Sequence, residues 1–344
     1  MHDGHTAELA PQPYDPAMER RHAALRERTR AVISEVDWQL HLPWIDAIQD
    51  LKAARKAVVL AHNYQAPEIF HGIADLTGDS LALAQQANRV EADTIVMCGV
   101  HFMAETAKVL NPAKTVLMPD THAGCSLASA ITAADVRLLK QRYPGVPVVT
   151  YVNTSAEVKA ESDVCCTSAN AVHVVESLGV PRVLFLPDQY LGRYVASQTR
   201  KVELILWQGS CEVHERFSAA QVQALREGGR NYVLAHPECP PEVLAEADFT
   251  GSTAAMVSHL DKRRPPRVVM ITECSMADNV AVEFPEITFI KPCNLCPHMR
   301  RITLPRVYQS LLKGQHQVDV PLAIAQRARQ AVERMLAIGR RESA

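Results

Sequence analysis

The sequence predicts an α/β protein built from three similar units, each with a small parallel sheet. Two observations predict this class. From residue 57 onward, short apolar segments alternate with segments of helical periodicity, which is typical of parallel strands joined by crossover helices. Three cysteines also recur at nearly equal spacing, and a fixed period of this kind indicates an internal repeat.

The three cysteines are Cys125, Cys211 and Cys296, which lie 86 and then 85 residues apart. Each ends a turn-rich loop that follows an apolar run, in TVLMPDTHAGC, ELILWQGSC and ITFIKPCNLC. If the units surround a pseudo-threefold axis, these loops bring three thiols to one point. Three thiolates around one cluster leave a coordination position open, as a catalytic metal requires. The alternative is that α/β proteins look self-similar at this period without a true repeat.

The expected elements follow the same order in each unit. The first unit has strands at 57–62, 94–99 and 115–118 and helices at 80–90 and 102–110; the second has strands at 146–152, 183–187 and 203–207 and helices near 155–160, 168–178 and 190–197; the third has strands at 231–236, 267–272 and 287–291 and helices at 241–247 and 253–261. Further helices are expected at 17–35, at 44–55 and within 316–344. The predicted domains are an N-terminal helical extension (1–45), three α/β repeats (46–130, 131–217 and 218–304) and a helical tail packed on the repeats (305–344).

Composition excludes several classes of protein. The 36 Lys and Arg against 38 Asp and Glu give a net charge of −2, which argues against a nucleic-acid partner or a membrane-surface partner. No apolar run reaches the roughly 18–20 residues of a membrane span, and the N-terminus lacks the apolar core of a secretory signal, so we expect a cytoplasmic protein. Nine cysteines, an odd number, then favour metal or catalytic use over a disulfide framework.

A polar tripeptide follows the first strand of each unit. These are His62-Asn63-Tyr64, Tyr151-Val152-Asn153 and His236-Pro237-Glu238. The carboxyl ends of parallel strands face one edge, so the tripeptides and the cysteine loops are expected to gather there. His236 and Glu238 suit shared acid–base work, and Tyr64 and Tyr151 suit proton donation. The alternative for each tyrosine is an interior residue whose hydroxyl is satisfied.

Small hydroxyl residues mark the start of one helix in each unit: Ser80, Ser168, and Ser252 with Thr253. Free backbone N–H groups at a helix N-terminus attract carboxylate and phosphate groups. The alternative is that these residues are simply helix caps.

The other cysteines and histidines carry weaker signals. Cys293 and Cys296 form a close pair, which is a weak signal for zinc and fits a redox pair equally well. Core positions are expected for Cys98, Cys165, Cys166, Cys239 and Cys274. For His62, His214 and His236, a role in the site and simple surface exposure remain equally open.

Longer motifs carry a resemblance to a known family. HNYQAPEI, GDSLALAQQA, FMAETAKVL, YVNTSAEVKAESD, PDQYLGRYVA, WQGSCEVHE, HPECPPEV, TGSTAAM and CPHM occur in this order between residues 56 and 304. Together they resemble the quinolinate synthase family, the A protein of nicotinamide adenine dinucleotide (NAD) biosynthesis.

The resemblance implies a fold, a reaction and a cofactor. The fold is three three-layer α/β/α domains around a pseudo-threefold axis. The reaction condenses iminoaspartate with dihydroxyacetone phosphate to quinolinate, phosphate and two waters, and an enzyme that produces iminoaspartate would be a partner. The cofactor is a 4Fe-4S cluster held by Cys125, Cys211 and Cys296, with one open iron that acts as a Lewis acid.

The resemblance also assigns residues to substrate. They are His62, Ser80, Tyr151, Asn153, Ser168, His236, Glu238 and Thr253, with Tyr64 as an acid–base residue. Some relatives carry a third cysteine where this chain has Ile290, so Cys293 is expected to be a spare, redox-sensitive thiol. Two alternatives remain: a 4Fe-4S hydro-lyase for another hydroxy acid, and a zinc-stabilised binding protein without catalysis.

Overall fold

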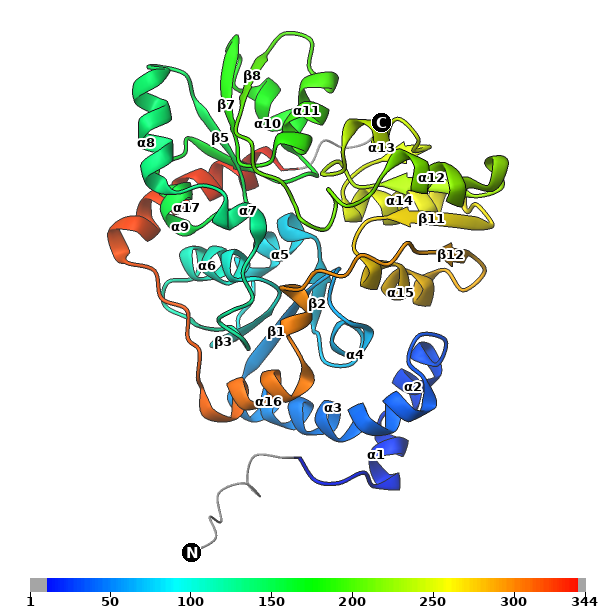
Figure 1. Cartoon of the computed structure of the whole chain (residues 1–344). Coiled ribbons are helices and arrows are strands. Elements are labelled where there is room, and N and C mark those ends of the chain that lie inside the picture. The colour runs from blue at the N-terminus through cyan, green and yellow to red at the C-terminus, as the bar shows by residue number, and fades with distance from the viewer. Residues whose placement is uncertain (1–10, 340–344) are drawn as a thin grey trace, which may run out of the picture.

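The computed structural model describes residues 11–339 and confirms the predicted fold class. It contains three four-stranded sheets, and every strand pair in them is parallel. The three sheets with their flanking helices surround a common centre (Figure 1). The predicted domain boundaries remain predictions, since the sheets do not by themselves divide the chain.

All three sheets have the same strand order, in which the first strand of the unit lies between its second and third strands. The orders are β2-β1-β3-β4, β6-β5-β7-β8 and β10-β9-β11-β12. The strands are β1 (Ala57–His62), β2 (Leu76–Gly78), β3 (Thr94–Cys98), β4 (Thr115–Leu117), β5 (Val148–Tyr151), β6 (Val164–Cys166), β7 (Arg182–Leu186), β8 (Glu203–Leu206), β9 (Tyr232–Ala235), β10 (Phe249–Thr250), β11 (Arg267–Ile271) and β12 (Thr288–Ile290). The edge strands β2, β6 and β10 were not predicted, because each is two or three residues long and lies outside a longer apolar run.

Helices connect the strands and cover the sheets. In the first unit they are α4 (Pro67–Phe70), α5 (Ser80–Ala87), α6 (His101–Leu110) and α7 (Ser126–Ser129); in the second α8 (Ala133–Arg142), α9 (Ala156–Ala160), α10 (Ala171–Ser177) and α11 (Gln189–Gln198); in the third α12 (Ala219–Arg226), α13 (Pro241–Leu244), α14 (Thr253–Arg263) and α15 (Cys274–Glu283). The short helices α4 and α7 and the helices α8, α12 and α15 were absent from the prediction.

One contact between an aspartate and the first strand repeats in all three units. An aspartate that precedes each edge strand accepts the N–H of a valine in the first strand at 2.8 Å, and its own N–H donates to the carbonyl of the same valine. The pairs are Asp75 with Val59, Asp163 with Val148, and Asp248 with Val233. An aspartate at the equivalent position therefore holds the edge strand beside the first strand in each unit, which supports a true repeat over chance similarity.

The N-terminal helices differ from the prediction. The single helix expected at 17–35 is two helices, α1 (Pro16–Arg21) and α2 (Ala23–Thr29). The next helix, α3 (Glu35–Arg55), begins well before the expected residue 44, because Ser34 caps it by accepting the N–H of Asp37. At the other end, α16 (Leu304–Lys313) packs against α3, and α17 (Leu322–Ile338) packs against α9 and β6.

Candidate active site

One cavity lies where the three units meet, and all twelve residues assigned to the site from the sequence line it. They are His62, Tyr64, Ser80, Cys125, Tyr151, Asn153, Ser168, Cys211, His236, Glu238, Thr253 and Cys296. The cavity has a volume of about 70 Å³, and side chains from all three units line it.

The tripeptides reach this cavity because the strand registers match. Ala61 pairs with Cys98, Thr150 with Leu186, and Ala235 with Ile271, and each is the last residue of its strand that pairs with the neighbouring strand β3, β7 or β11. The next residue is therefore His62, Tyr151 or His236 at the same level in each unit. Two equivalent positions then supply the site in each unit: the first holds His62, Tyr151 or His236, and the second holds Tyr64, Asn153 or Glu238. Parallel strands present their carboxyl ends at a common edge, as expected.

The cysteine loops are tethered in the same way in each unit. The first backbone N–H of α6, α11 or α15 donates to the carbonyl two residues before the cysteine. The bonds are His101 to Ala123 at 2.8 Å, Gln189 to Gly209 at 2.9 Å, and Cys274 to Asn294 at 3.2 Å. The three loops thus end at equivalent places beside the cavity.

The three thiols are free and partly buried. Desolvation raises the pKa of Cys125 to about 12 and that of Cys296 to about 11, and it raises the pKa of Cys211 well above its usual value. Without a metal, all three are therefore protonated thiols at neutral pH. Because metals bind the thiolate, loading a metal here must release protons.

The hydroxyl residues divide between capping and the cavity. Ser252 caps α14 through the N–H of Ala255, and Asp79 caps α5 through the N–H of Ala82. Ser80 and Thr253, each the first residue of its helix, are left to line the cavity with Ser168. The capping interpretation is therefore right for Ser252 and wrong for Ser80.

Glu238 is the buried charged group at the centre of the site. The Tyr151 hydroxyl donates to its Oε1 at 2.5 Å, and His214 Nδ1 lies 2.7 Å from its Oε2. Burial opposes ionisation, but the neighbouring His236 and His214 rings and these two hydrogen bonds outweigh it and hold the pKa of Glu238 below its usual range. Glu238 is therefore a carboxylate at neutral pH.

A hydrogen-bonded chain continues from Glu238 to the first unit. The other ring nitrogen of His214, Nε2, lies 3.0 Å from the Thr272 hydroxyl oxygen, which lies 2.7 Å from the Tyr64 hydroxyl. Desolvation, followed by the nearby Glu238 carboxylate, raises the pKa of Tyr64 well above its usual value, so the phenol keeps its proton. The chain from Tyr64 to Tyr151 therefore joins all three units.

His214 and Thr272 were not assigned to the site from the sequence. His214 is buried and lines the cavity, so the surface alternative considered for it is wrong. Its signal was its place three residues after Cys211. Thr272 is also buried and lies directly after β11. Nothing in the sequence around Thr272 indicated a role in the site.

Two imidazoles in the cavity are neutral. Burial lowers the pKa of His62 to about 4 and that of His236 to about 3. His62 Nδ1 accepts the N–H of Tyr64 at 3.2 Å, so the ring proton of neutral His62 is on Nε2. Within residues 11–339, the buried His236 Nδ1 and Asn153 Oδ1 make no hydrogen bond. Unpaired buried polar atoms that line a cavity indicate that a polar ligand completes the site.

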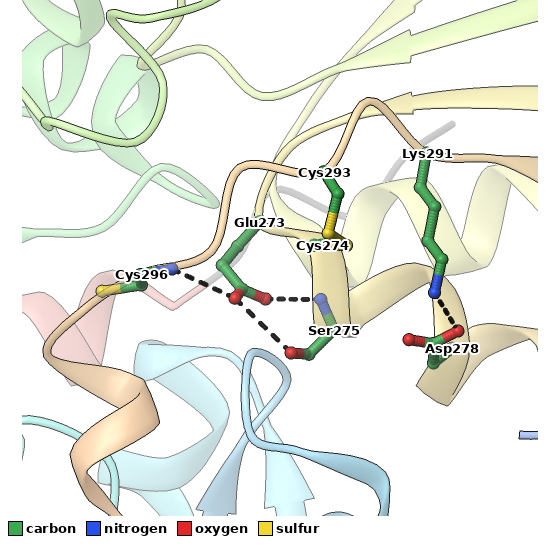
Figure 2. The surroundings of a disulfide bond; sticks show 7 residues. All are labelled: Glu273, Cys274, Ser275, Asp278, Lys291, Cys293 and Cys296. Atoms are coloured by element: carbon green, nitrogen blue, oxygen red, sulfur yellow. Dashed lines mark hydrogen bonds and ion pairs between the residues drawn. A yellow bond between two sulfur atoms is a disulfide. The ribbon is translucent and has the colours of Figure 1, made fainter. Parts of the chain in front are cut away.

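The prediction that Cys293 is a spare thiol is wrong. Cys293 forms a disulfide with Cys274, the first residue of α15 (Figure 2). Cys274 is buried as predicted, but it is paired. Beside this bond, the Glu273 carboxylate accepts the N–H of Cys296 at 3.2 Å and that of Ser275 at 2.7 Å. The loop that carries the third cysteine is thus held to α15 by a covalent bond as well as by hydrogen bonds.

Comparison with known proteins identifies the family. The family model described as quinolinate synthetase A protein matches residues 46–337. The chain belongs to the quinolinate synthetase A family. It is 63% identical over 317 residues to quinolinate synthase 2 of Mesorhizobium japonicum, covering 92% of this chain and 98% of the relative. It is 62% identical to quinolinate synthase of Agrobacterium fabrum over 92% of each chain, and 63% identical to quinolinate synthase of Xylella fastidiosa over 86% of this chain and 87% of the relative.

Family membership makes the chain an enzyme of NAD biosynthesis and confirms the resemblance stated from the motifs. Between residues 11 and 339, no helix is both long and apolar enough to cross a membrane. One further donor group lies in the cavity: atoms of Cys211, His214 and Glu238 lie within 4.8 Å of one another, and such a set can bind a metal ion. Two metal arrangements, three cysteines or this mixed set, therefore share Cys211.

Proposed function

We propose that the chain condenses iminoaspartate with dihydroxyacetone phosphate to quinolinate, releasing phosphate and two waters. One observation carries the proposal: twelve residues from three separate units, each matching a family motif, line a single cavity. His236 Nδ1 and Asn153 Oδ1, which make no hydrogen bond within the described residues, fit a substrate that is rich in oxygen and nitrogen.

The cofactor that we propose is a 4Fe-4S cluster held by Cys125, Cys211 and Cys296. The donor chemistry fits, since three free thiols on three equivalent loops line one cavity and leave one iron without a protein ligand. When bound, the cluster would supply a Lewis acid that helps a substrate hydroxyl leave as water.

The mixed set of Cys211, His214 and Glu238 fits a metal less well. Both oxygens of Glu238 already bind protein groups, Oε1 the Tyr151 hydroxyl and Oε2 the His214 ring. A metal bound by His214 Nδ1 and Glu238 Oε2 would have to replace the 2.7 Å bond between these two atoms before it gained these ligands. We therefore assign His214 and Glu238 to the hydrogen-bonded chain.

Anionic groups of the substrates would bind where helices begin. Ser80 and Thr253 are the first residues of α5 and α14, and Ser168 lies just before α10. Their hydroxyls and the nearby backbone N–H groups suit carboxylate or phosphate oxygens. Neutral His62 would donate from Nε2, and Asn153 would present its unpaired Oδ1, so that together they orient the intermediate.

Proton movement would use the chain from Tyr64 to Tyr151. Glu238 is ionised and would accept a proton, while Tyr64 keeps its proton and would donate it. His214 would carry a proton between Glu238 and Thr272, because its two ring nitrogens face these two groups. The site also encloses the substrates, which matters because an imine hydrolyses in water. For the same reason we propose that the enzyme that makes iminoaspartate is a partner.

The test is iron, acid-labile sulfide and product on protein purified without oxygen. We expect about four irons and four sulfides per chain and quinolinate from the two substrates. Zinc without sulfide would instead support the zinc-stabilised binding protein, and dehydration of another hydroxy acid without quinolinate would support the hydro-lyase. Glu238→Gln should cut turnover and leave the cluster spectrum unchanged; unchanged turnover would remove Glu238 from the mechanism.

A further inference from the structure

Asn279 connects the third unit to the loop of the first unit that carries Tyr64. It lies on α15 and is 2% exposed. Its Nδ2 donates to the carbonyl of Asn63 at 3.1 Å and to the carbonyl of Gln65 at 2.8 Å. The two bonds therefore hold Asn63 and Gln65, the two residues that flank Tyr64.

The rest of the loop explains why these two bonds matter. Its N–H groups are held within the first unit, since Asn63 donates to Gly78, and Tyr64 and Gln65 donate to His62. The carbonyls of Asn63 and Gln65 are held from outside, by one side chain. An amide suits this task, because its single nitrogen carries two protons and can bind both carbonyls while remaining uncharged.

The same segment of the third unit also holds the other end of Tyr64. Thr272, which precedes α15 by two residues, bonds the Tyr64 hydroxyl at 2.7 Å. Residues between Thr272 and Asn279 thus hold both the backbone around Tyr64 and its hydroxyl through hydrogen bonds. A shift of this loop would move the phenol relative to the cavity and break the chain to Glu238.

Asn279 is bound to the rest of the described chain through the donors of its amide and not through its oxygen. Within the described residues, the buried Oδ1 of Asn279 makes no hydrogen bond. An unpaired buried carbonyl oxygen destabilises a folded protein, and an apolar side chain of the same size would avoid that cost. The two donated bonds are what an apolar side chain cannot replace.

We propose that Asn279 is a positioning residue for Tyr64, acting on turnover through the loop at residues 63–65. The inference rests on the proposed role of Tyr64 as a proton donor. Asn279 does not line the cavity, so its loss is expected to lower kcat and leave KM nearly unchanged. Misplacing a reacting group by about 1 Å can cost roughly 100-fold in rate, so we expect a fall in kcat of about 10- to 100-fold.

The test compares two substitutions of Asn279 with a matched control. Asn279→Ala removes the amide, and Asn279→Leu removes it while filling the same space. The control is Asn111→Ala: Asn111 is also buried, and its Nδ2 also donates to two backbone carbonyls, those of Ala87 and Ala107, but it does not line the cavity. Unfolding temperature, iron content, kcat and KM are measured for each variant.

Both Asn279 variants should lose turnover with KM within about threefold and iron content unchanged, while Asn111→Ala keeps wild-type kcat. Adding either Asn279 substitution to Tyr64→Phe should cause no further loss, because the group being positioned is already absent. Wild-type kcat in Asn279→Leu, or a full additional loss on the Tyr64→Phe background, would overturn the inference. Wild-type turnover of Tyr64→Phe itself would instead refute the proposed role of Tyr64.

Discussion

Removal of the Cys274–Cys293 disulfide is expected to destabilise the protein without emptying the site. The two cysteines are 19 residues apart and enclose α15 and β12. Closing a loop of that length lowers the entropy of the unfolded chain and stabilises the fold by about 3 kcal/mol. The change that tests this is the double substitution Cys274→Ala and Cys293→Ala.

The loop that carries Cys296 should keep its position after this change, for a reason visible in the other two units. There the loops of Cys125 and Cys211 are tethered by the backbone bond from a helix N-terminus, and neither Cys125 nor Cys211 is joined to another cysteine. The third loop keeps that bond, the bond from Cys296 to Glu273 and the ion pair between Lys291 and Asp278 when the disulfide is lost (Figure 2). We therefore expect iron and sulfide content to stay at the wild-type level.

The assay is urea unfolding of wild type and double variant, each with and without dithiothreitol. Reductant should lower the unfolding free energy of the wild type by about 3 kcal/mol, to the value of the variant, and should leave the variant unchanged. Equal stability of the oxidised wild type and the variant would refute the entropic argument. Loss of iron from the variant would refute the argument that hydrogen bonds suffice to hold the third loop.

Three further predictions concern the site and its surroundings. Replacing Cys125, Cys211 or Cys296 by Ala should remove most iron and sulfide, while Cys98→Ala, at a buried position in β3, should keep both; equal iron in all four variants would contradict the ligand assignment. Tyr151→Phe removes the 2.5 Å bond to Glu238. A hydrogen bond to a charged group contributes about 1.5–3 kcal/mol, so kcat should fall about 10- to 100-fold, and wild-type kcat would contradict this. Burial and the nearby Arg28 lower the pKa of His71 to about 4, so the folded state favours the neutral ring. Its stabilisation is present above pH 6.5 and is lost as the pH falls toward 4, about 1–2 kcal/mol after allowing for partial exposure. His71→Gln should flatten the stability curve in this range, and an unchanged slope would show that another group titrates there.

The central strands could be predicted from the sequence because they are buried on both faces and appear as apolar runs. The edge strands β2, β6 and β10 could not, since they are defined by pairing with a neighbour rather than by their own residues. The same holds for α3, whose first residue depends on the Ser34 cap rather than on the apolar pattern.

The candidate site divides in a similar way. Site residues at strand ends could be predicted, because the apolar run that predicts each strand also shows where the strand ends. The pairing of Cys274 with Cys293 depends on how β12 returns beside α15. Thr272 joins the site because Tyr64 and His214 reach it from the other two units. Contacts between units are set by tertiary packing, which local periodicity does not contain.

The repeat itself suggests why one part of the site is uniform and another is not. A cluster held symmetrically needs the same donor from each unit, and the three tethered loops each end in cysteine. A substrate that is condensed and dehydrated in one direction needs different groups on its different sides. The two tripeptide positions provide them, with His, Tyr and His at the first and Tyr, Asn and Glu at the second. Only one of these six side chains is a carboxylate, and it bonds the tyrosine of the second unit and the histidine that leads through Thr272 to the first. Exchanging residues between equivalent tripeptide positions should therefore abolish turnover while iron and sulfide content is retained. Such an exchange leaves the three cysteine loops unchanged and alters only the groups that transfer protons.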